Sequence, residues 1–460
     1  MSFTTFENVV SWLDGQMNLE KLTTGYTKRT YRLDRMHALL DHLGHPEATF
    51  KSIHVAGSKG KGSTAAFIAS GLSALGHRTG LYMSPHVSDY RERFTRAGQF
   101  FPDAEIIAAA DALHEAIQDF HFSDQWGSEA PTTFELYTSL AYMLFARSGC
   151  SWAVIETGLG GRLDATNTLM PEAAVLCPIE LEHTSILGST LSQIAIEKSK
   201  IIMPGRPVFV SFQSQEAMDV FTAEAHAQGS DMTTLARETS CISAKTTKEG
   251  ELVDITWKDG QLTRMRLSMM GEVQAENCAL ALLVLKKLGQ YQAGKTEAAL
   301  ETCLLPGRFQ VLAGCGTPLY IDGAHTVNSL TRLMHSFKEI HDETKTTVIY
   351  GALLDKDHDH MTRIILETAH TIIVSTPGHF KKSDPDALYA TFRKNAQDMG
   401  RDSDILLIKD ARDALEEAFR ITPQDGAILS CGSFYLAGDI RQAYDGLMES
   451  MEKGRETACP

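Results

Sequence analysis

Residues 52–75, SIHVAGSKGKGSTAAFIASGLSAL, decide how this chain folds. Residues 52–56 predict a short buried strand. From Thr64 on, apolar residues recur at helical spacing up to Leu75, and Gly76 ends the run. The loop between strand and helix consists of Gly57, Ser58, Lys59, Gly60, Lys61, Gly62 and Ser63. Such a loop at a helix N-terminus predicts an anion site, because backbone N–H groups and the helix dipole point at one spot.

The composition of the loop favours a nucleotide as the anion. Lys61 supplies a positive charge for the outer phosphates, and the glycines let phosphate approach the backbone. The pattern GxxGKGS is shorter than the common GxxxxGK[ST] loop, and Gly62 stands where Ser or Thr usually follows the lysine. A glycine-rich turn with a solvated lysine is the structural alternative. We interpret the stretch as a nucleotide site.

Length, charge and cysteine usage narrow the class of protein. A chain of 460 residues predicts two or three domains. The net charge of −15 argues against broad binding to nucleic acid or to anionic membranes. The sequence has no apolar run of membrane-spanning length and no secretory leader, and its eight cysteines are scattered without a CxxC pair. We therefore expect a cytoplasmic protein whose cysteines are structural.

Strand and helix signals alternate along the chain, which predicts an α/β fold with a mostly parallel sheet and helices on both faces. Residues 1–50 are expected to be helical, and two alternating runs around residues 258–260 predict a hairpin. The Pro-Gly break at residues 306–307 predicts a boundary between an ATP-binding domain of residues 1–305 and a smaller α/β domain of residues 306–460. The other expected strands are residues 79–83, 152–155, 173–179, 207–211, 319–321, 347–350, 371–375, 405–408 and 427–430, and the expected helices include residues 191–202 and 274–288.

Several polar residues follow predicted strands, and in open α/β sheets ligands bind beyond the carboxyl ends of strands. Glu156 ends the strand of residues 152–155 and is our first candidate ligand for Mg²⁺, a hard ion that nucleotide phosphates require. His183 and Asp322 also follow strands, and Lys198 lies on a predicted helix. Each of these residues alone would be interpreted as structural or solvated, and only their co-occurrence indicates a site.

Nine motifs resemble those of the folylpolyglutamate synthase/dihydrofolate synthase family, a branch of the ATP-dependent Mur ligase group. They span residues 52–441 and read HVAGSKGKGST, MSPH, TTFE, ETGLGGRLDATN, EHT-x3-G, IAIEKSKI, LPGRFQ, IDGAH and CGSFYLAG. The resemblance implies a P-loop ATPase-type N-terminal domain and a Rossmann-like C-terminal domain. It also implies ATP and two Mg²⁺ ions as cofactors, and a monomer as the oligomeric state.

The resemblance further implies a role for each matching residue. The loop of residues 57–63 would hold the triphosphate, Ser84 and Glu156 would bind the first Mg²⁺, and His183 with a carbamylated Lys198 would serve the second. Asn277, Arg308 and Asp322 would hold the nucleotide, and His325 and Ser433 would lie near the incoming glutamate. Thr133, Phe134 and Glu135 would face the pterin-bearing substrate. Because these ligands are split between the domains, domain closure would assemble the site.

The implied reaction joins L-glutamate to folate through an amide bond, with ATP and an acyl phosphate intermediate; dihydropteroate is left open as a second acceptor. Phosphoryl transfer needs positioning and charge neutralisation more than a covalent nucleophile, which agrees with the residues found. The partners expected are therefore small molecules only, with neither nucleic acid nor membrane among them.

Four positions depart from the family pattern, and two other functions stay open. Thr326 follows DGAH where Asn and Pro are usual, Ser199-Lys200 replaces Ala-Gly, Glu182 replaces Asp, and Ser58-Lys59 replaces Thr-Asn. The change at Thr326 puts amino-acid specificity most in doubt. It motivates one alternative, a Mur-type ligase for a different carboxylate and amino acid. The other is a non-catalytic nucleotide-binding protein whose glutamate site has decayed.

Overall fold

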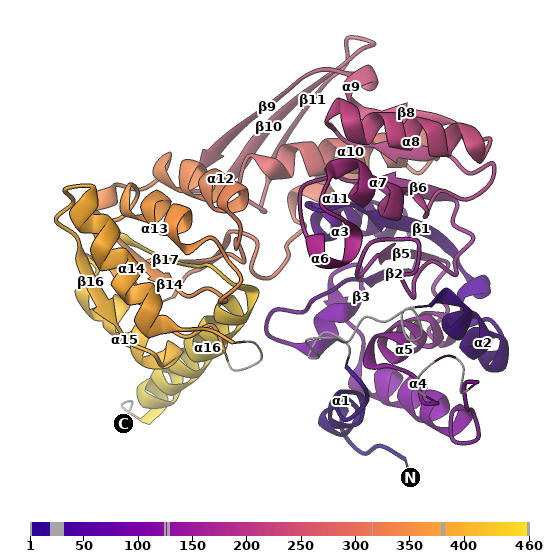
Figure 1. The fold of residues 1–460 in the computed structure, drawn as a ribbon, viewed down its shortest axis with the longest axis horizontal. Coiled ribbons are helices and arrows are strands. Elements are labelled where there is room, and N and C mark those ends of the chain that lie inside the picture. Colours follow the sequence, from indigo (N-terminus) through magenta and orange to yellow (C-terminus); the bar gives the residue numbers. More distant parts are fainter. Residues whose placement is uncertain are drawn as a thin grey trace.

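The computed structural model describes residues 2–18, 32–123, 126, 129–314, 316–378 and 382–457. Two lobes are joined by a linker near residues 302–309, with the first lobe indigo to pink and the second orange to yellow in Figure 1. The expected helical region 1–50 contains α1 (Phe6–Asp14), α2 (Leu33–Leu43) and a 3₁₀ turn over Pro46–Thr49, and its residues 19–31 lie outside the described part. Cys315 and Cys459 lie outside it as well.

The first lobe is built on an eight-stranded sheet whose strands are mostly parallel, as predicted. The strands β2, β5, β1, β6, β7 and β8 pair in parallel, and β3 and β4 extend the β2 edge in the antiparallel sense. Their order is β4 (Gln99–Phe100), β3 (Phe94–Arg96), β2 (Thr79–Tyr82), β5 (Trp152–Glu156), β1 (Lys51–Ala56), β6 (Ala173–Leu176), β7 (Val208–Val210) and β8 (Met232–Thr234). The central strands are buried on both faces because helices cover both sides.

Helices cover both faces of this sheet in three groups. The core on one face includes α3 (Lys61–Ala74) and α10 (Val273–Lys287), with α11 (Lys295–Glu301) beside them. The core on the other face includes α1, α2, α4 (Asp103–Ala116) and α5 (Thr133–Arg147). Near β6 to β8 lie α6 (Thr184–Leu187), α7 (Leu191–Ser199), α8 (Gln215–Ala227) and α9 (Leu235–Glu238). Because α3 lies between the sheet and α10, it is buried nearly all round, which its many small residues permit.

The predicted hairpin is confirmed and belongs to a separate three-stranded antiparallel sheet. It consists of β10 (Gly250–Trp257) and β11 (Leu262–Leu267), and β9 (Thr239–Thr247) pairs with β10 on the other side. We did not predict β9, because its sequence is polar and most of its residues are exposed. This sheet reaches the second lobe, where Thr246 N–H donates to Glu339 at 3.1 Å (Figure 1).

The second lobe is the smaller α/β domain that the sequence predicts. Its sheet has the order β12 (Gln310–Leu312), β13 (Leu319–Ile321), β17 (Ala427–Cys431), β14 (Thr346–Tyr350), β15 (Thr371–Val374) and β16 (Asp404–Leu407), with only β12 antiparallel to its neighbour. One face packs on α12 (Val327–Lys338), α13 (His358–Leu366) and α14 (Pro385–Asp398). The other face packs on α15 (Ala411–Ile421) and α16 (Phe434–Thr457).

Two further expectations concern the whole chain. None of the helices in the described ranges is long and apolar enough to cross a membrane. Six cysteines of the described part carry free thiols, and five of these are buried, which agrees with a structural role.

Candidate functional site

The glycine loop lies at the carboxyl end of β1, between β6 and the N-terminus of α3. The N–H groups of Ser58 and Lys59 donate to the carbonyl of Pro178 at 2.8 and 3.3 Å, and the Ser58 hydroxyl donates to the carbonyl of Glu180 at 3.0 Å. These bonds fix the first half of the loop to the segment after β6. The N–H groups of Lys61, Gly62 and Ser63 at the start of α3 have no partner within the helix by its geometry and are the ones offered to an anion, whereas the Thr64 N–H donates to the carbonyl of Gly60 at 2.9 Å.

Gly60 is the point at which the loop turns into α3. Its φ of 79° is left-handed, and a Cβ there would lie 2.3 Å from Oδ1 of Asn277. Asn277 lies on α10, is 6% exposed, and donates from Nδ2 to Gln274 at 3.0 Å. The candidate nucleotide residue Asn277 is therefore in contact with the loop, and only glycine fits between them.

Glu156 and Lys61 form an ion pair at the centre of the site. Lys61 Nζ lies 3.7 Å from Glu156 Oε1, and the Ser84 N–H donates to Glu156 Oε2 at 3.3 Å. Burial raises the pKa of Glu156, and Lys61 counteracts that shift. Burial likewise works against the charge of Lys61, but Glu182 and Glu156 outweigh it and raise the pKa of Lys61. The structure thus brings together three of the residues that the sequence selected.

Lys198 is buried between the loop and Glu182. Its Nζ donates to the carbonyl of Gly57 at 2.8 Å and lies 2.8 Å from Glu182 Oε1. Burial lowers the pKa of Lys198, and Glu182 opposes that shift. His183, at the start of α6, has a φ of 46°, is exposed, and lies within electrostatic reach of Glu182, Lys198 and Lys61. We had treated Glu182 only as a departure from the family pattern, whereas here its carboxylate is the partner of Lys198.

The stability of this cluster is expected to depend on pH through Glu182. Burial alone would raise the pKa of Glu182, but Lys61 and Lys198 lower it from 4.5 to about 2. A lowered pKa contributes stability above pH 4.5 that is lost as the pH falls toward 2, and the shift corresponds to about 3 kcal/mol. We expect Glu182→Gln to destabilise the protein at pH 7, with the difference from wild type shrinking below pH 4.5. Chemical denaturation at several pH values measures the difference in the free energy of unfolding between the two proteins. A difference that does not vary with pH would contradict the lowered pKa of Glu182.

Arg308 of the linker and Asp322, at the carboxyl end of β13, lie near the same centre. Asp322 accepts from the N–H groups of Phe309 and Ala324, both at 2.7 Å. The Arg308 guanidinium lies 4.1 Å from the ring centre of Phe434, and burial lowers its pKa while Asp322 and Glu156 support its charge. Within the described residues, Nη1 of Arg308 is buried without a hydrogen-bond partner. A buried and unsatisfied guanidinium nitrogen fits an anionic ligand such as a nucleotide phosphate.

His325 and Ser433 lie at the carboxyl ends of β13 and β17 in the second lobe. His325 Nδ1 is 2.7 Å from the carbonyl of Gly323, and burial lowers the pKa of His325 to about 3. Lys59 of the glycine loop is also among the charges that act on His325. Ser433 is 3% exposed and accepts from the Tyr435 N–H at 3.1 Å. Of the two candidate glutamate residues, His325 therefore lies within electrostatic reach of the phosphate loop.

Sequence reasoning missed Lys356, which lies between β14 and α13. Its side chain is 22% exposed and its Nζ is 3.2 Å from Asp355. Its charge acts on Lys59, His183 and His325, so it belongs to the same site. Glu156 was selected because it is a polar residue at the carboxyl end of a strand. The same rule applies to the segment after β14, which contains Lys356.

The TTFE segment gives a different result for each of its candidates. The Thr133 hydroxyl donates to the carbonyls of Leu13 and Gln16 at 3.3 and 3.2 Å. Both Glu135 oxygens accept from Arg35, at 2.8 and 3.1 Å, and one also accepts from a backbone N–H in the capping box of α5. The polar groups of Thr133 and Glu135 are thus engaged within the protein. Phe134 is half-buried, its ring lies against Gly158, and it is the residue of this segment that presents a surface to a ligand.

The residues present fit Mg²⁺ held together with a nucleotide. In the described ranges, no group of three or more His, Cys, Asp or Glu residues could hold a metal by itself. Mg²⁺ bound to phosphates needs only one or two protein oxygens, and Glu156, with Ser84 beside it, provides them. A separate depression of about 730 Å³ lies at the opposite end of the strands, beside Lys51 and Trp152, where β1 and β5 begin. It contains none of the predicted site residues.

A phosphate loop with strand-end carboxylates, completed by cations from a linker and a second α/β domain, is the arrangement of a Mur ligase. Residues 55–285 match the family model of the Mur ligase middle domain, and residues 307–434 match that of the Mur ligase glutamate ligase domain.

Similarity to individual proteins narrows this class. The dihydrofolate synthase/folylpolyglutamate synthase of Bacillus subtilis is 30% identical over 446 residues, which cover 96% of this chain and 99% of that protein. The crystal structure of Mycobacterium tuberculosis folylpolyglutamate synthase with ADP and AMPPCP is 26% identical, with a TM-score of 0.83 over 95% of this chain and 98% of that one. A folylpolyglutamate synthase complex with AMPPCP and folate is 27% identical, with a TM-score of 0.79 over 96% of this chain and 100% of that one. The chain belongs to the folylpolyglutamate synthase/dihydrofolate synthase family.

Proposed function

We propose that this ATP-dependent ligase adds L-glutamate to a folate through an acyl phosphate, and that dihydropteroate is a second acceptor. The observation that carries the proposal is the convergence of Lys61, Glu156 and Arg308 at the carboxyl ends of the strands, with His325 facing them from the second lobe. Related structures hold an ATP analogue with folate, which supports the same two ligands here. The division into residues 1–305 and 306–460, a monomeric state and a cytoplasmic location complete the proposal.

The residues would share the work of phosphoryl transfer. Lys61 and the loop N–H groups would hold the β- and γ-phosphates, Arg308 would reach the nucleotide from the linker, and Asn277 and Asp322 would fix their surroundings. Bound Mg²⁺, held at Ser84 and Glu156, would neutralise charge on the phosphates. His183 and a carbamylated Lys198 would hold a second ion. Because these groups position and neutralise charge, the attacking carboxylate needs no covalent help from the protein.

The folate carboxylate would attack the γ-phosphorus and release ADP, giving an acyl phosphate. The amine of glutamate would then attack the acyl carbon, form the amide bond and expel phosphate. Phe134 would contact the pterin side of the acceptor, and His325 and Ser433 would lie near the incoming amino acid. Lys356, a partly exposed cation whose charge acts on His325, would suit one carboxylate of that amino acid.

A turnover assay tests this function. Purified protein is given ATP, Mg²⁺ and glutamate together with dihydropteroate or tetrahydrofolate, and ADP and the amide product are measured. We expect ADP only when an acceptor and glutamate are both present. ATP binding without turnover would support the non-catalytic alternative. Turnover with another amino acid or carboxylate, and none with glutamate and folates, would support the related-ligase alternative.

The substitution at Thr326 is expected to leave glutamate specificity intact. Thr326 is the N-cap of α12, and its hydroxyl accepts from the Ser329 N–H at 3.3 Å. Asparagine caps helices equally well, so Thr326→Asn should change the KM for glutamate by no more than about twofold. Thr326→Ala should cost about 1 kcal/mol of stability through the lost cap. Steady-state kinetics with different amino acids measure the KM, and urea denaturation measures the stability. A new amino-acid preference in Thr326→Asn would instead show that this position affects specificity.

A further inference from the structure

One face of α16 contacts both halves of the site. Phe434, Gly438 and Gln442 are spaced four residues apart, so they lie in a row on one side of the helix. We call this row the α16 stripe. Its first member, Phe434, lies under the Arg308 guanidinium at 4.1 Å and meets the His325 ring edge to face at 5.8 Å. The stripe therefore begins beside the candidate nucleotide and glutamate residues.

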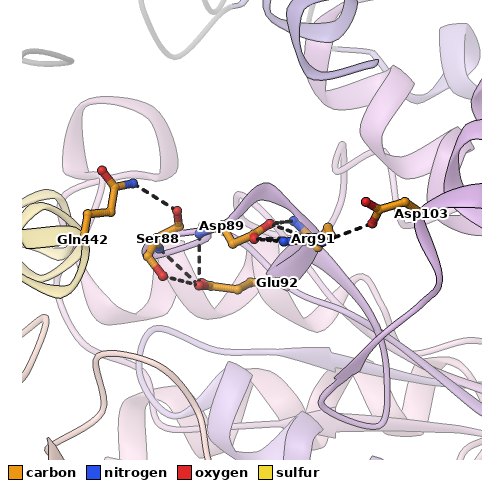
Figure 2. A network of polar contacts seen from close by, with 6 residues as sticks. All are labelled: Ser88, Asp89, Arg91, Glu92, Asp103 and Gln442. Atoms are coloured by element: carbon orange, nitrogen blue, oxygen red, sulfur yellow. Dashed lines mark hydrogen bonds and ion pairs between the residues drawn. The ribbon is translucent and has the colours of Figure 1, made fainter. Parts of the chain in front are cut away.

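The rest of the stripe touches the segment of the first lobe that carries Ser84. We define the Ser84 loop as residues 84–93, which join β2 to β3. A Cβ at Gly438 would lie 2.1 Å from the carbonyl oxygen of Val87. Gln442 Nε2 donates to the carbonyl of Ser88 at 3.3 Å, as Figure 2 shows. Two consecutive backbone carbonyls of the loop thus rest on consecutive turns of α16.

The Ser84 loop is held as one piece by the buried carboxylate of Glu92. Its oxygens accept from the Val87 N–H at 2.6 Å. They also accept from the N–H groups of Ser88 and Asp89, both at 3.1 Å, and from the Ser88 hydroxyl at 2.9 Å (Figure 2). A carboxylate that accepts several charge-assisted bonds restricts the backbone on which they lie. A displacement at Val87 is therefore not absorbed within the tip of the loop.

The loop is also fixed at its base and on its outer side. The Met83 N–H donates to the carbonyl of Arg93 at 3.0 Å and closes the base. Arg91 pairs with Asp89 at 2.6 Å and with Asp103 at the start of α4 at 3.0 Å (Figure 2). Because base and outer side are anchored to the first lobe, the side toward α16 is the one that the second lobe can move.

Gly438 is needed for space rather than for backbone conformation. It lies inside α16, where glycine costs about 1 kcal/mol relative to alanine. Any side chain at this position would occupy the place of the Val87 carbonyl. Gly446 lies two turns further along the same helix, and a Cβ there would have no atom within 4 Å. The two glycines form a matched pair, with and without the interdomain contact.

We propose that the α16 stripe positions Ser84, so that the candidate Mg²⁺ residue is correctly placed only while the second lobe is docked. Gly438 is the positioning residue, because it allows the Val87 carbonyl to approach the helix. The proposal rests on the function given above in assigning Ser84 to Mg²⁺. The proposal goes beyond the ligase function because the contact between α16 and the Ser84 loop couples the metal site to the position of the second lobe. No substrate or metal ion takes part in that contact.

The test compares Gly438→Ala with Gly446→Ala in the full-length protein. Both variants gain helix propensity, but Gly438→Ala must also displace the Val87 carbonyl. Gly446→Ala should therefore be at least as stable as wild type in thermal unfolding, and Gly438→Ala should be less stable than Gly446→Ala. Only Gly438→Ala is expected to speed hydrogen exchange at residues 84–93, to lower kcat by about 10-fold to 100-fold, and to raise the Mg²⁺ concentration that gives half-maximal rate. The KM for the acceptor should change less than kcat, and Gly446→Ala should match wild type in every readout.

Wild-type exchange at residues 84–93 and an unchanged Mg²⁺ requirement in Gly438→Ala would overturn the proposal. If Gly438→Ala does not fold, Gln442→Glu provides the second test, because its carboxylate would repel the Ser88 carbonyl; the same changes, smaller in size, are expected, and their absence overturns the proposal. Hydrogen exchange does not depend on turnover. A protein inactive with every acceptor would therefore refute the proposed function while leaving the contact itself open to measurement.

Discussion

Lys61→Met is expected to lower kcat by about 10²–10³-fold while the protein stays folded, because one preorganised charge at a transferring phosphoryl group has an effect of this size. Lys61 Nζ lies 3.7 Å from Glu156, and both groups lie in the cluster with Glu182. Methionine is unbranched and only one atom shorter than lysine, and it removes the charged ammonium group. Steady-state kinetics with saturating acceptor and glutamate measure the effect, and calorimetry with an ATP analogue shows whether binding is lost with it.

Lys59→Met is the matched control for this variant. Lys59 lies two residues earlier in the same loop, and burial lowers its pKa, whereas the pKa of Lys61 is raised. The acidic residues that act on Lys59 are Glu182 and Glu180, and Glu156 is not among them. We expect Lys59→Met to reduce kcat by less than Lys61→Met, by about 10-fold at most. Equal losses in the two variants would mean that the loop responds to its total charge, and would contradict a specific role for Lys61.

Arg35→Met is expected to destabilise the first lobe by about 3–5 kcal/mol, because it leaves the buried Glu135 carboxylate without its partner. Arg35 has no exposed surface, and its guanidinium also donates to the carbonyls of Trp126 and Ala130 and lies 3.9 Å from the ring centre of Phe122. One buried side chain thus joins α2, the segment before α5 and the N-terminus of α5. Urea denaturation measures the loss.

The double variant Arg35→Met, Glu135→Met separates the buried charge from the packing. Removing both partners of a buried pair is often close to neutral, so the double variant should be more stable than Arg35→Met alone. If the single and double variants are equally destabilised, then the lost contacts to Trp126, Ala130 and Phe122 account for the effect, and the ion pair does not.

The sequence was most informative where structure is local. The strand–loop–helix unit around Lys61 was predictable because a buried apolar run, glycines and helical periodicity lie next to one another in the chain. Strand-end residues such as Glu156 and Asp322 were predictable because parallel sheets bring their carboxyl ends to one edge. The helix begins at Lys61 and not at Thr64, because Gly60 provides the cap and the first turn is made of loop residues.

What escaped prediction depends on partners that are distant in the chain. The role of Glu182 requires knowing that Lys198 lies 2.8 Å away, and that of Phe434 requires knowing that Arg308 lies above its ring. The TTFE motif shows a second limit of prediction, in a segment that the sequence did single out. A conspicuous motif does not separate a residue that faces a ligand, such as Phe134, from one that caps a helix, such as Glu135.

The charges described at the site also bear on how substrates arrive. Lys59, Lys61, Arg308 and Lys356 gather around Glu156 and Glu182, in a chain whose net charge is −15. Anions such as nucleotides, folates and glutamate are therefore repelled by the net charge of the chain and attracted by the cations at the site. Such a contrast focuses the field, so that diffusional encounters are steered toward the mouth between the lobes and slow down as ionic strength screens it.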